Sequence, residues 1–227
     1  MYFGYDRFGV AWIPHPDEPL ARLGRDWSGW CADEGRRVPH PLVDGLGRWA
    51  AAALRPVELT GLALEIVSPR PLANPGAIWQ LDTALLRAAA LRAGFEAPPL
   101  VPAIRDGRVV LAAERPVPAL AAIGRAVTEQ IGGFLAGPPA FPCGAGMRLA
   151  LSGPTDRVTA ARLMRRLVPS VEALEVVGPE IRDIALIGDP GLGRPVRVLA
   201  RFGLGRAMAS AQGGALELVG GCSPITA

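Results

Sequence analysis

Lysine is absent from this chain, and all 24 basic residues of the 227 are arginine. Histidine occurs only twice, and cysteine three times, at Cys31, Cys143 and Cys222. The cysteines are widely spaced and form no Cys-x-x-Cys pair, which argues against a disulfide framework and against a structural zinc site. We therefore expect no metal and no disulfide in the native protein.

Long apolar runs are also missing. No stretch of eighteen uninterrupted apolar residues occurs, so the sequence predicts no transmembrane helix and no membrane insertion. The first fourteen residues do not form a signal peptide, because Asp6 and Arg7 interrupt the apolar run and a small-residue cleavage site is lacking. These absences favour a soluble, cytoplasmic protein.

The basic excess is small, with a formal net charge of +3 and a sequence pI near 9.1. Acidic residues are interspersed with the arginines, so no basic stripe of the kind that neutralises phosphates is visible. This pattern disfavours nucleic acid as a partner. A nucleic-acid binder would have to show salt-dependent association with RNA.

Hydrophobic periodicity predicts strands and helices in alternation. Strands are expected over residues 7–13, 59–67, 99–104, 108–113, 147–152, 182–187 and 196–202. Helices are expected over 19–30, 43–54, 78–91, 118–134 and 155–167, the last one capped by Thr155. Asp106-Gly107 is a strong hairpin signal. Residues 188–193 are glycine-rich but lie between two predicted strands with no helix after them, which favours a hairpin loop over a phosphate-binding loop.

This element order predicts an α+β fold with two lobes, in which antiparallel sheets face a central cleft and helices lie outside. We expect one domain over residues 1–205. Its lobes would comprise roughly residues 55–140 and residues 1–54 plus 141–205. Residues 206–227 are rich in Gly, Ala and Ser and predict a loosely held C-terminal tail.

Three stretches, taken in order, carry a family resemblance. They are Arg7-Phe-Gly-Val-Ala-Trp-Ile-Pro14, the segment from Pro19-Leu through Gly24 to Trp30, and Pro195-Val-Arg-Val-Leu-Ala-Arg-Phe-Gly-Leu-Gly205. Over roughly residues 5 to 205 the chain resembles the two-histidine (2H) phosphoesterase superfamily. Within it, the chain is most similar to a family of unknown function encoded beside phosphonate-degradation genes.

The resemblance implies two His-x-Thr triplets, one on a strand of each lobe. Residues two apart on a strand face the same side, so each triplet would direct an imidazole and a hydroxyl into the cleft. The first triplet should fall within residues 61–69, which places Ala63 and Glu65 at the histidine and threonine positions. The second should fall within residues 147–153, which places Arg148 and Ala150 there. Both motifs are lost.

The loss should silence the family's mechanism. A positioned acid or base contributes about 10²- to 10⁴-fold, so losing both could cost on the order of 10⁴ to 10⁸. Alanine transfers no proton, and arginine stays charged over the useful pH range. His15 and His40 remain, beside prolines in predicted turns, which favours exposed loop histidines. A relocated acid and base would require both loops to reach the cleft.

Other residues leave alternatives open. Arg148 could bind an anion in the cleft, or be solvated, or pair with Glu65 across the lobes. Cys143 lacks a nearby histidine in the sequence, which favours a free structural thiol over a nucleophile. The tryptophans of the N-terminal quarter are predicted to be core residues, although an exposed pair would mark a partner surface. They are Trp12, Trp27, Trp30 and Trp49.

We therefore expect a catalytically degenerate 2H-phosphoesterase-like protein that acts as a binding or subunit protein in a larger assembly. Its partner would be a protein or an anionic small molecule, and no cofactor is implied. The alternative is a phosphodiesterase-type enzyme, a phosphoric diester hydrolase linked to phosphonate or cyclic-phosphate metabolism, that uses a displaced site.

Overall fold

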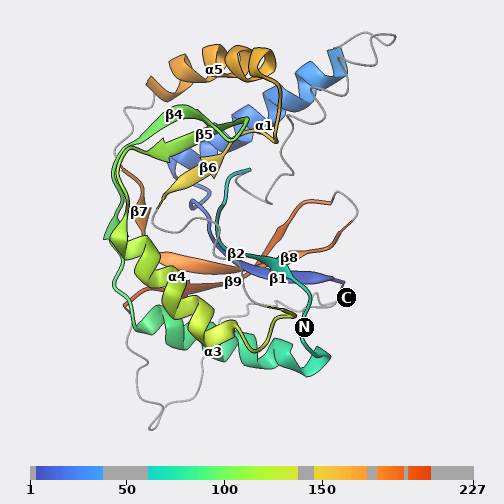
Figure 1. Cartoon of the computed structure of the whole chain (residues 1–227), viewed down its shortest axis with the longest axis vertical. Helices are drawn as coiled ribbons and strands as arrows, with labels where there is room; N and C mark the ends of the chain where they lie inside the picture. Colours follow the sequence, from blue (N-terminus) through green and yellow to red (C-terminus); the bar gives the residue numbers. More distant parts are fainter. Residues whose placement is uncertain (1–3, 38–60, 138–145, 173–177, 192–193, 206–227) are drawn as a thin grey trace, which may run out of the picture.

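The computed structural model describes residues 4–37, 61–137, 146–172, 178–191 and 194–205 of the chain. Strands and helices alternate along these residues, which confirms the predicted α+β class. Antiparallel sheets of four and three strands form the centre of the molecule, and the labelled helices lie on their outer sides (Figure 1).

The larger sheet has the strand order β2-β1-β8-β9, and every neighbouring pair is antiparallel. Its strands are β1 (Arg7–Trp12), β2 (Leu64–Arg70), β8 (Asp183–Asp189) and β9 (Arg197–Gly203). This sheet joins the first described strand of the chain to the last two. Residues separated by most of the sequence therefore meet in it.

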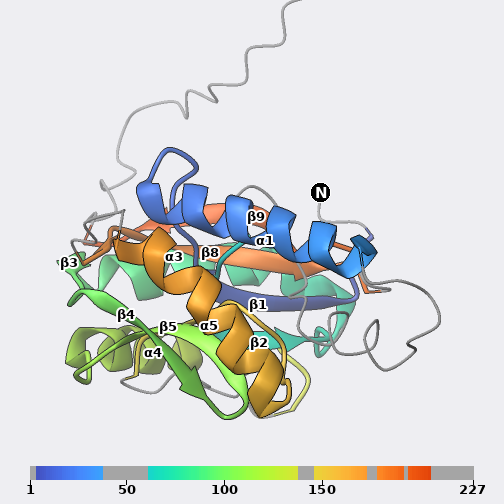
Figure 2. The same cartoon turned by 90° about the horizontal axis from the view of Figure 1, so that it is seen from above.

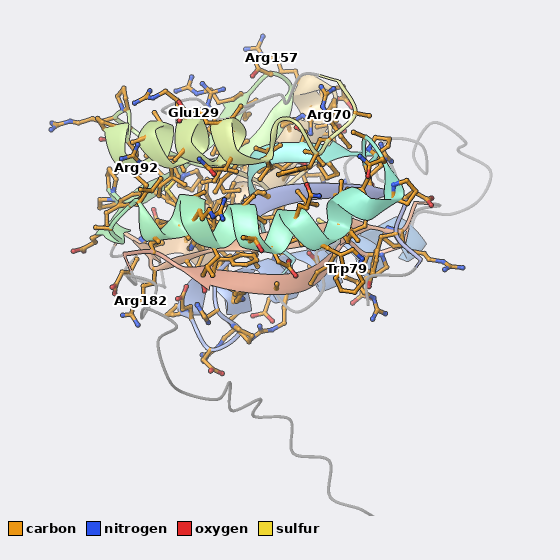
Figure 3. The ribbon with its side chains drawn as sticks, turned by 90° about the horizontal axis from the view of Figure 1, so that it is seen from below. Arg70, Trp79, Arg92, Glu129, Arg157 and Arg182 are labelled. Carbon is orange, nitrogen blue, oxygen red and sulfur yellow. The ribbon has the colours of Figure 1, made fainter. Side chains whose placement is uncertain are left out.

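Helices α3 (Ile78–Ala90) and α4 (Pro118–Ile131) lie side by side against one face of the larger sheet (Figure 3). A short 3-10 turn, η1 (Pro75–Ala77), leads into α3. Apolar side chains of both helices share one buried cluster with the alternate residues of β1 and β8 that point toward them. That alternation leaves the residues between them on the other face.

The smaller sheet has the strand order β4-β5-β6. Its strands are β4 (Leu100–Arg105), β5 (Arg108–Ala113) and β6 (Arg148–Ala150). Between β4 and β5 the backbone turns through Asp106 and Gly107, whose φ angles are 52° and 70°. Two positive φ angles in sequence define the tight hairpin turn that Asp-Gly predicted, so the hairpin is confirmed.

Helix α5 (Arg157–Glu172) packs on β4 and β5, and α1 (Pro19–Arg37) runs beside α5 (Figure 2). The buried indole of Trp27 in α1 donates a hydrogen bond from Nε1 to the carbonyl of Leu151, at 2.6 Å. This bond fixes α1 to the residue that follows β6. A polar indole group buried in this way normally has such a partner.

A third, two-stranded sheet pairs β3 (Phe95–Glu96) with β7 (Glu180–Ile181). The sequence does not predict these strands, because two residues are too short to show a strand period. One apolar cluster contains residues of both larger sheets and of the four described α-helices. The described part of the chain thus shares one main core, beside which lies one small separate cluster on the larger sheet.

Strand β2 corrects the predicted strand over 59–67, which was expected to stop at Ser68-Pro69. The strand begins at Leu64 and continues through Pro69 to Arg70. β2 is an edge strand, where the missing N–H of a proline need not cost a ladder hydrogen bond. The pairing of β2 with β1 is irregular between Phe8 and Val10.

Helix α5 corrects the predicted cap. Asp156, rather than Thr155, accepts hydrogen bonds through Oδ1 from the backbone N–H groups of Val158 (2.9 Å) and Thr159 (3.0 Å). The helix then passes the expected end at residue 167, and Pro169 lies inside it. Helix α1 is also longer than expected, ending at Arg37 rather than near residue 30.

The remaining predicted elements match the structure to within a few residues, as element bounds set by periodicity usually do. The predicted helix over 43–54 and the tail over 206–227 lie outside the described residues. Each large sheet combines strands from residues 55–140 with strands from 1–54 or 141–205, since β2 pairs with β1 and β5 with β6. The division into two lobes at these bounds stays a prediction.

Among the described residues, none of the helices is both long enough and apolar enough to cross a membrane.

Candidate functional site

The first pair of motif positions lies at the start of β2. Ala63 comes directly before the strand and packs against a small apolar cluster. This cluster consists of Ala11, Ile13, Ala185 and Ile187. It lies on the face of the larger sheet turned away from α3 and α4, which we call the distal face. Glu65 pairs with Ala11, so both motif positions are on the distal face, as the spacing of two predicts.

The second pair of positions lies on β6. Arg148 pairs with Ala112 and Ala150 with Val110, so the two side chains share one face of the smaller sheet. Leu149 between them is fully buried in the main core. Arg148 is about half exposed, and its nearest acidic partner is Asp106 of the hairpin, with the two charged groups 3.5 Å apart.

Strands β2 and β6 contact each other, so the structure brings the two motif strands together. The charged residues on them are not paired. Within the described part of the chain, Glu65 accepts a hydrogen bond from Ser68 (3.1 Å), and Arg148 forms its ion pair with Asp106. The ion pair between Arg148 and Glu65 that was offered as an alternative is therefore not formed, because Glu65 bonds within its own strand and Arg148 pairs with the β4–β5 hairpin.

A polar cluster that sequence reasoning missed lies at one end of the distal face. The carboxylate of Asp183, the first residue of β8, is within 2.9 Å of Nε2 of His15 and within 3.1 Å of the Arg201 guanidinium. The same Arg201 nitrogen donates to the carbonyl of Ile13, at 3.0 Å. Arg201 on β9 pairs with Ala185 on β8, which pairs with Ala11, the partner of Glu65. Arg201 and Glu65 therefore lie in the same cross-strand row of the larger sheet.

Burial separates the members of this polar cluster. Asp183 is buried, with 8% of its surface exposed, whereas the His15 side chain is 45% exposed. The Arg201 side chain is 23% exposed, and its second terminal nitrogen is buried without a hydrogen-bond partner. A buried carboxylate thus orients one imidazole and one guanidinium. This is a more constrained state for His15 than the exposed loop histidine that was expected.

Glu18, beside the start of α1, completes the surroundings of His15. Burial raises the pKa of its carboxyl above the ordinary value of 4.5, and electrostatic interactions with the nearby His15 and Arg182 oppose that shift. Asp183 adds to the shift through its own negative charge. One signal could have indicated this cluster from sequence, namely an aspartate at the start of a strand whose other residues are all apolar or glycine up to Asp189.

Other candidate features give no site in the described residues. Within the described ranges, no group of three His, Cys, Asp or Glu side chains is arranged to hold a metal ion. The segment from Gly188 joins two antiparallel strands, as a hairpin does. Trp12 and Trp27 are core residues, as predicted. His40, Trp49, Cys143 and Cys222 lie outside the described residues.

Comparison with known proteins identifies the fold. No protein-family profile matches the chain, and no curated protein sequence matches it. The crystal structure of Escherichia coli LigT complexed with 3′-AMP is similar over 88% of this chain and 98% of that one, with 16% identity and a TM-score of 0.50. A structure described as a phosphoesterase has 16% identity and a TM-score of 0.48, over 88% of this chain and 98% of that one. Kluyveromyces marxianus Usb1 has 8% identity and a TM-score of 0.38, over 88% and 97%. This chain therefore shares the fold of LigT.

Proposed function

We propose that this protein is a catalytically degenerate form of the 2H phosphoesterase fold that binds a partner or an anionic ligand without hydrolysing it. The observation that carries the proposal is the set of side chains at the four motif positions. Two are methyl groups, at Ala63 and Ala150, and one is the guanidinium of Arg148. Glu65 alone can exchange a proton, and an acid–base mechanism needs two such groups.

Arg148 is the residue that we assign to anion binding. Its ion pair with Asp106 joins two exposed side chains at 3.5 Å, and such pairs contribute at most about 1 kcal/mol. An anionic ligand can therefore replace Asp106 at little cost. LigT, whose fold this chain shares, has been crystallised with 3′-AMP, so 3′-AMP is a reasonable first probe.

The binding arm of the test is calorimetric titration with 3′-AMP. Arg148→Ala should weaken binding about ten-fold or more, because it removes a charge-assisted hydrogen bond. Arg87→Ala removes an exposed arginine from α3, on the other side of the larger sheet, and should leave the affinity unchanged. Equal affinities of the wild type and Arg148→Ala for 3′-AMP would show that Arg148 does not bind the anion.

The alternative of a displaced catalytic site has one observation in its favour, the pair of His15 and Asp183. A carboxylate that holds Nε2 of an imidazole leaves Nδ1 available as a base, and Arg201 beside it could stabilise negative charge. We instead assign these residues to holding the end of β1 against β8 and β9.

The catalytic arm of the test separates the two functions. Purified wild type, Arg148→Ala and His15→Gln should all leave a 2′,3′-cyclic nucleotide unhydrolysed above the buffer rate. Turnover that Arg148→Ala or His15→Gln abolishes, and Arg87→Ala does not, would establish an enzyme. Co-purification from native cells would then show whether the chain is part of an assembly.

A further inference from the structure

A groove between α1 and α5 is separate from every motif position. Its lining comes from two helical stripes in which residues four apart lie above one another. From α1 the groove is lined by Arg22, Asp26 and Trp30, and also by Leu23 and Trp27. From α5 it is lined by Arg166 and Ser170. The groove holds a cavity of about 140 Å³. Because one water occupies about 30 Å³ in the liquid, this is room for one small polyatomic ion.

The base of the groove is aromatic and held in place. Trp27 is buried and bonded to the Leu151 carbonyl, and its ring lies 5.2 Å from that of Trp30 in a tilted arrangement. The guanidinium of Arg166 lies over the Trp30 ring, 5.7 Å from its centre. This cation–π contact orients the guanidinium without neutralising it.

The charges in the groove lack partners. Within the described ranges, the side chains of Arg22 and Asp26 make no hydrogen bond or ion pair, and Arg166 makes only its contact with Trp30. Two guanidiniums, one carboxylate and the Ser170 hydroxyl therefore border one cavity, with a net charge of +1. Such a lining matches a small anion that accepts several hydrogen bonds and also donates one.

Hydrogen phosphate has that chemistry. Its oxygens can accept from Arg22, Arg166 and Ser170, since guanidinium groups match phosphate geometry. Its P–OH group can donate to Asp26, which is a carboxylate acceptor. Sulfate has the same shape but carries no proton at neutral pH, so Asp26 would repel it. We propose that the α1–α5 groove is a binding site for a protonated phosphate group, selective against sulfate.

The test is calorimetric titration of the full chain with inorganic phosphate, sulfate and methyl phosphate, each at pH 6, where a phosphomonoester carries a proton on about half of its molecules. Wild type should bind phosphate at least ten-fold more tightly than sulfate. Binding of methyl phosphate as tight as that of phosphate would identify a phosphomonoester as the source, and its absence would identify the free ion.

Variants assign the binding to the groove. Arg22→Gln and Arg166→Gln should each weaken phosphate binding about ten-fold or more, as loss of a charge-assisted hydrogen bond predicts. Asp26→Asn should remove the preference over sulfate, because an amide can donate to either anion. Arg157→Gln, at the first turn of α5, is the matched control for Arg166→Gln and should have no effect (Figure 3). Arg148→Ala should have none either, which keeps this site distinct from the one proposed above.

Two results would overturn the proposal. The Arg22→Gln, Arg166→Gln double variant gives the concentration at which phosphate binds ordinary surface arginines. One overturning result is that wild type binds no phosphate in the groove at up to 10-fold above that concentration. The other is equal affinity of wild type for phosphate and sulfate. Far-ultraviolet circular dichroism of each variant should match that of wild type, because the substituted side chains lie at the surface of their helices.

Discussion

Gly9 determines how closely two strands of the larger sheet approach. A Cβ atom at this position would lie 2.7 Å from the Val67 carbonyl oxygen and 2.9 Å from the Pro69 nitrogen. Both contacts are with backbone of β2, which cannot rotate away as a side chain could. The irregular pairing of β1 with β2 thus depends on one missing methyl group.

Gly9→Ala should lower the free energy of unfolding by about 1 to 3 kcal/mol, the usual cost of overpacking. Gly29→Ala is the matched control, because a Cβ there would meet nothing within 4 Å and the residue lies exposed in α1. This control should raise the stability by about 0.5 to 1 kcal/mol, since alanine is the better helix former. Urea unfolding of both variants measures the difference, and equal effects would contradict the steric argument.

Glu18 gives a pH dependence at the same scale. Its pKa in the folded chain is raised above 4.5 by burial, so the folded state holds this proton more tightly than the unfolded state does. The resulting stabilisation is complete below the unfolded pKa and is lost as the pH rises through the folded pKa. At neutral pH the partly buried carboxylate of Glu18 therefore weakens the fold.

Glu18→Gln should gain stability relative to wild type as the pH rises from 4 to 7. Urea unfolding at each pH measures the difference between the two proteins. Glu129→Gln, an exposed change on α4, controls for the loss of one negative charge (Figure 3). A difference for Glu18→Gln that stays constant over this range would show that burial does not shift its carboxyl.

At the scale of the element, α5 depends on a single capping side chain. Asp156 satisfies two backbone N–H groups of the first turn with one oxygen, and its other oxygen accepts from the Thr159 hydroxyl at 2.7 Å. Thr155, the residue expected from sequence to cap the helix, has a buried hydroxyl that finds no hydrogen-bond partner among the described residues.

Asp156→Ala should destabilise the protein by about 0.5 to 2 kcal/mol, the usual cost of losing an N-cap. Thr155→Val should be neutral or stabilising, because it replaces an unsatisfied hydroxyl with a methyl group. Thermal unfolding of the two variants compares adjacent residues in one turn. A larger loss of thermal stability for Thr155→Val than for Asp156→Ala would show that Thr155 caps the helix, as the sequence indicated.

Elements with a strong period or turn signal were predictable, and those that depend on tertiary context were not. Asp106-Gly107 predicted its hairpin because only a few residues tolerate two positive φ angles. Pro69 was misread as a strand end, because an edge position is a property of the assembled sheet. Asp183 itself had a sequence signal, but its pairing with His15 could not be found, since the two residues are 168 apart in sequence. The assignment of the motif positions to β2 and β6 stays a prediction, and the sequence did not indicate the partners of the charged residues there.

At the scale of the whole molecule, two sheets share one apolar core. Because that cluster includes side chains from both sheets and from the four described α-helices, neither sheet can lose its packing alone. We expect one cooperative unfolding transition. Thermal curves from circular dichroism and from tryptophan fluorescence should have coincident midpoints. Two separate midpoints would show that the sheets unfold as independent units.

The strand order of the larger sheet also affects synthesis of the protein. β1 is synthesised before the other strands of this sheet, yet one of its two neighbours, β8, does not begin until Asp183. During most of translation β1 can pair with β2 only, and its second edge has exposed N–H and C=O groups. A growing chain stalled before residue 183 would present that edge to other nascent chains. We therefore expect the late synthesis of the β8–β9 hairpin, rather than helix formation, to determine how long the growing chain is prone to aggregation.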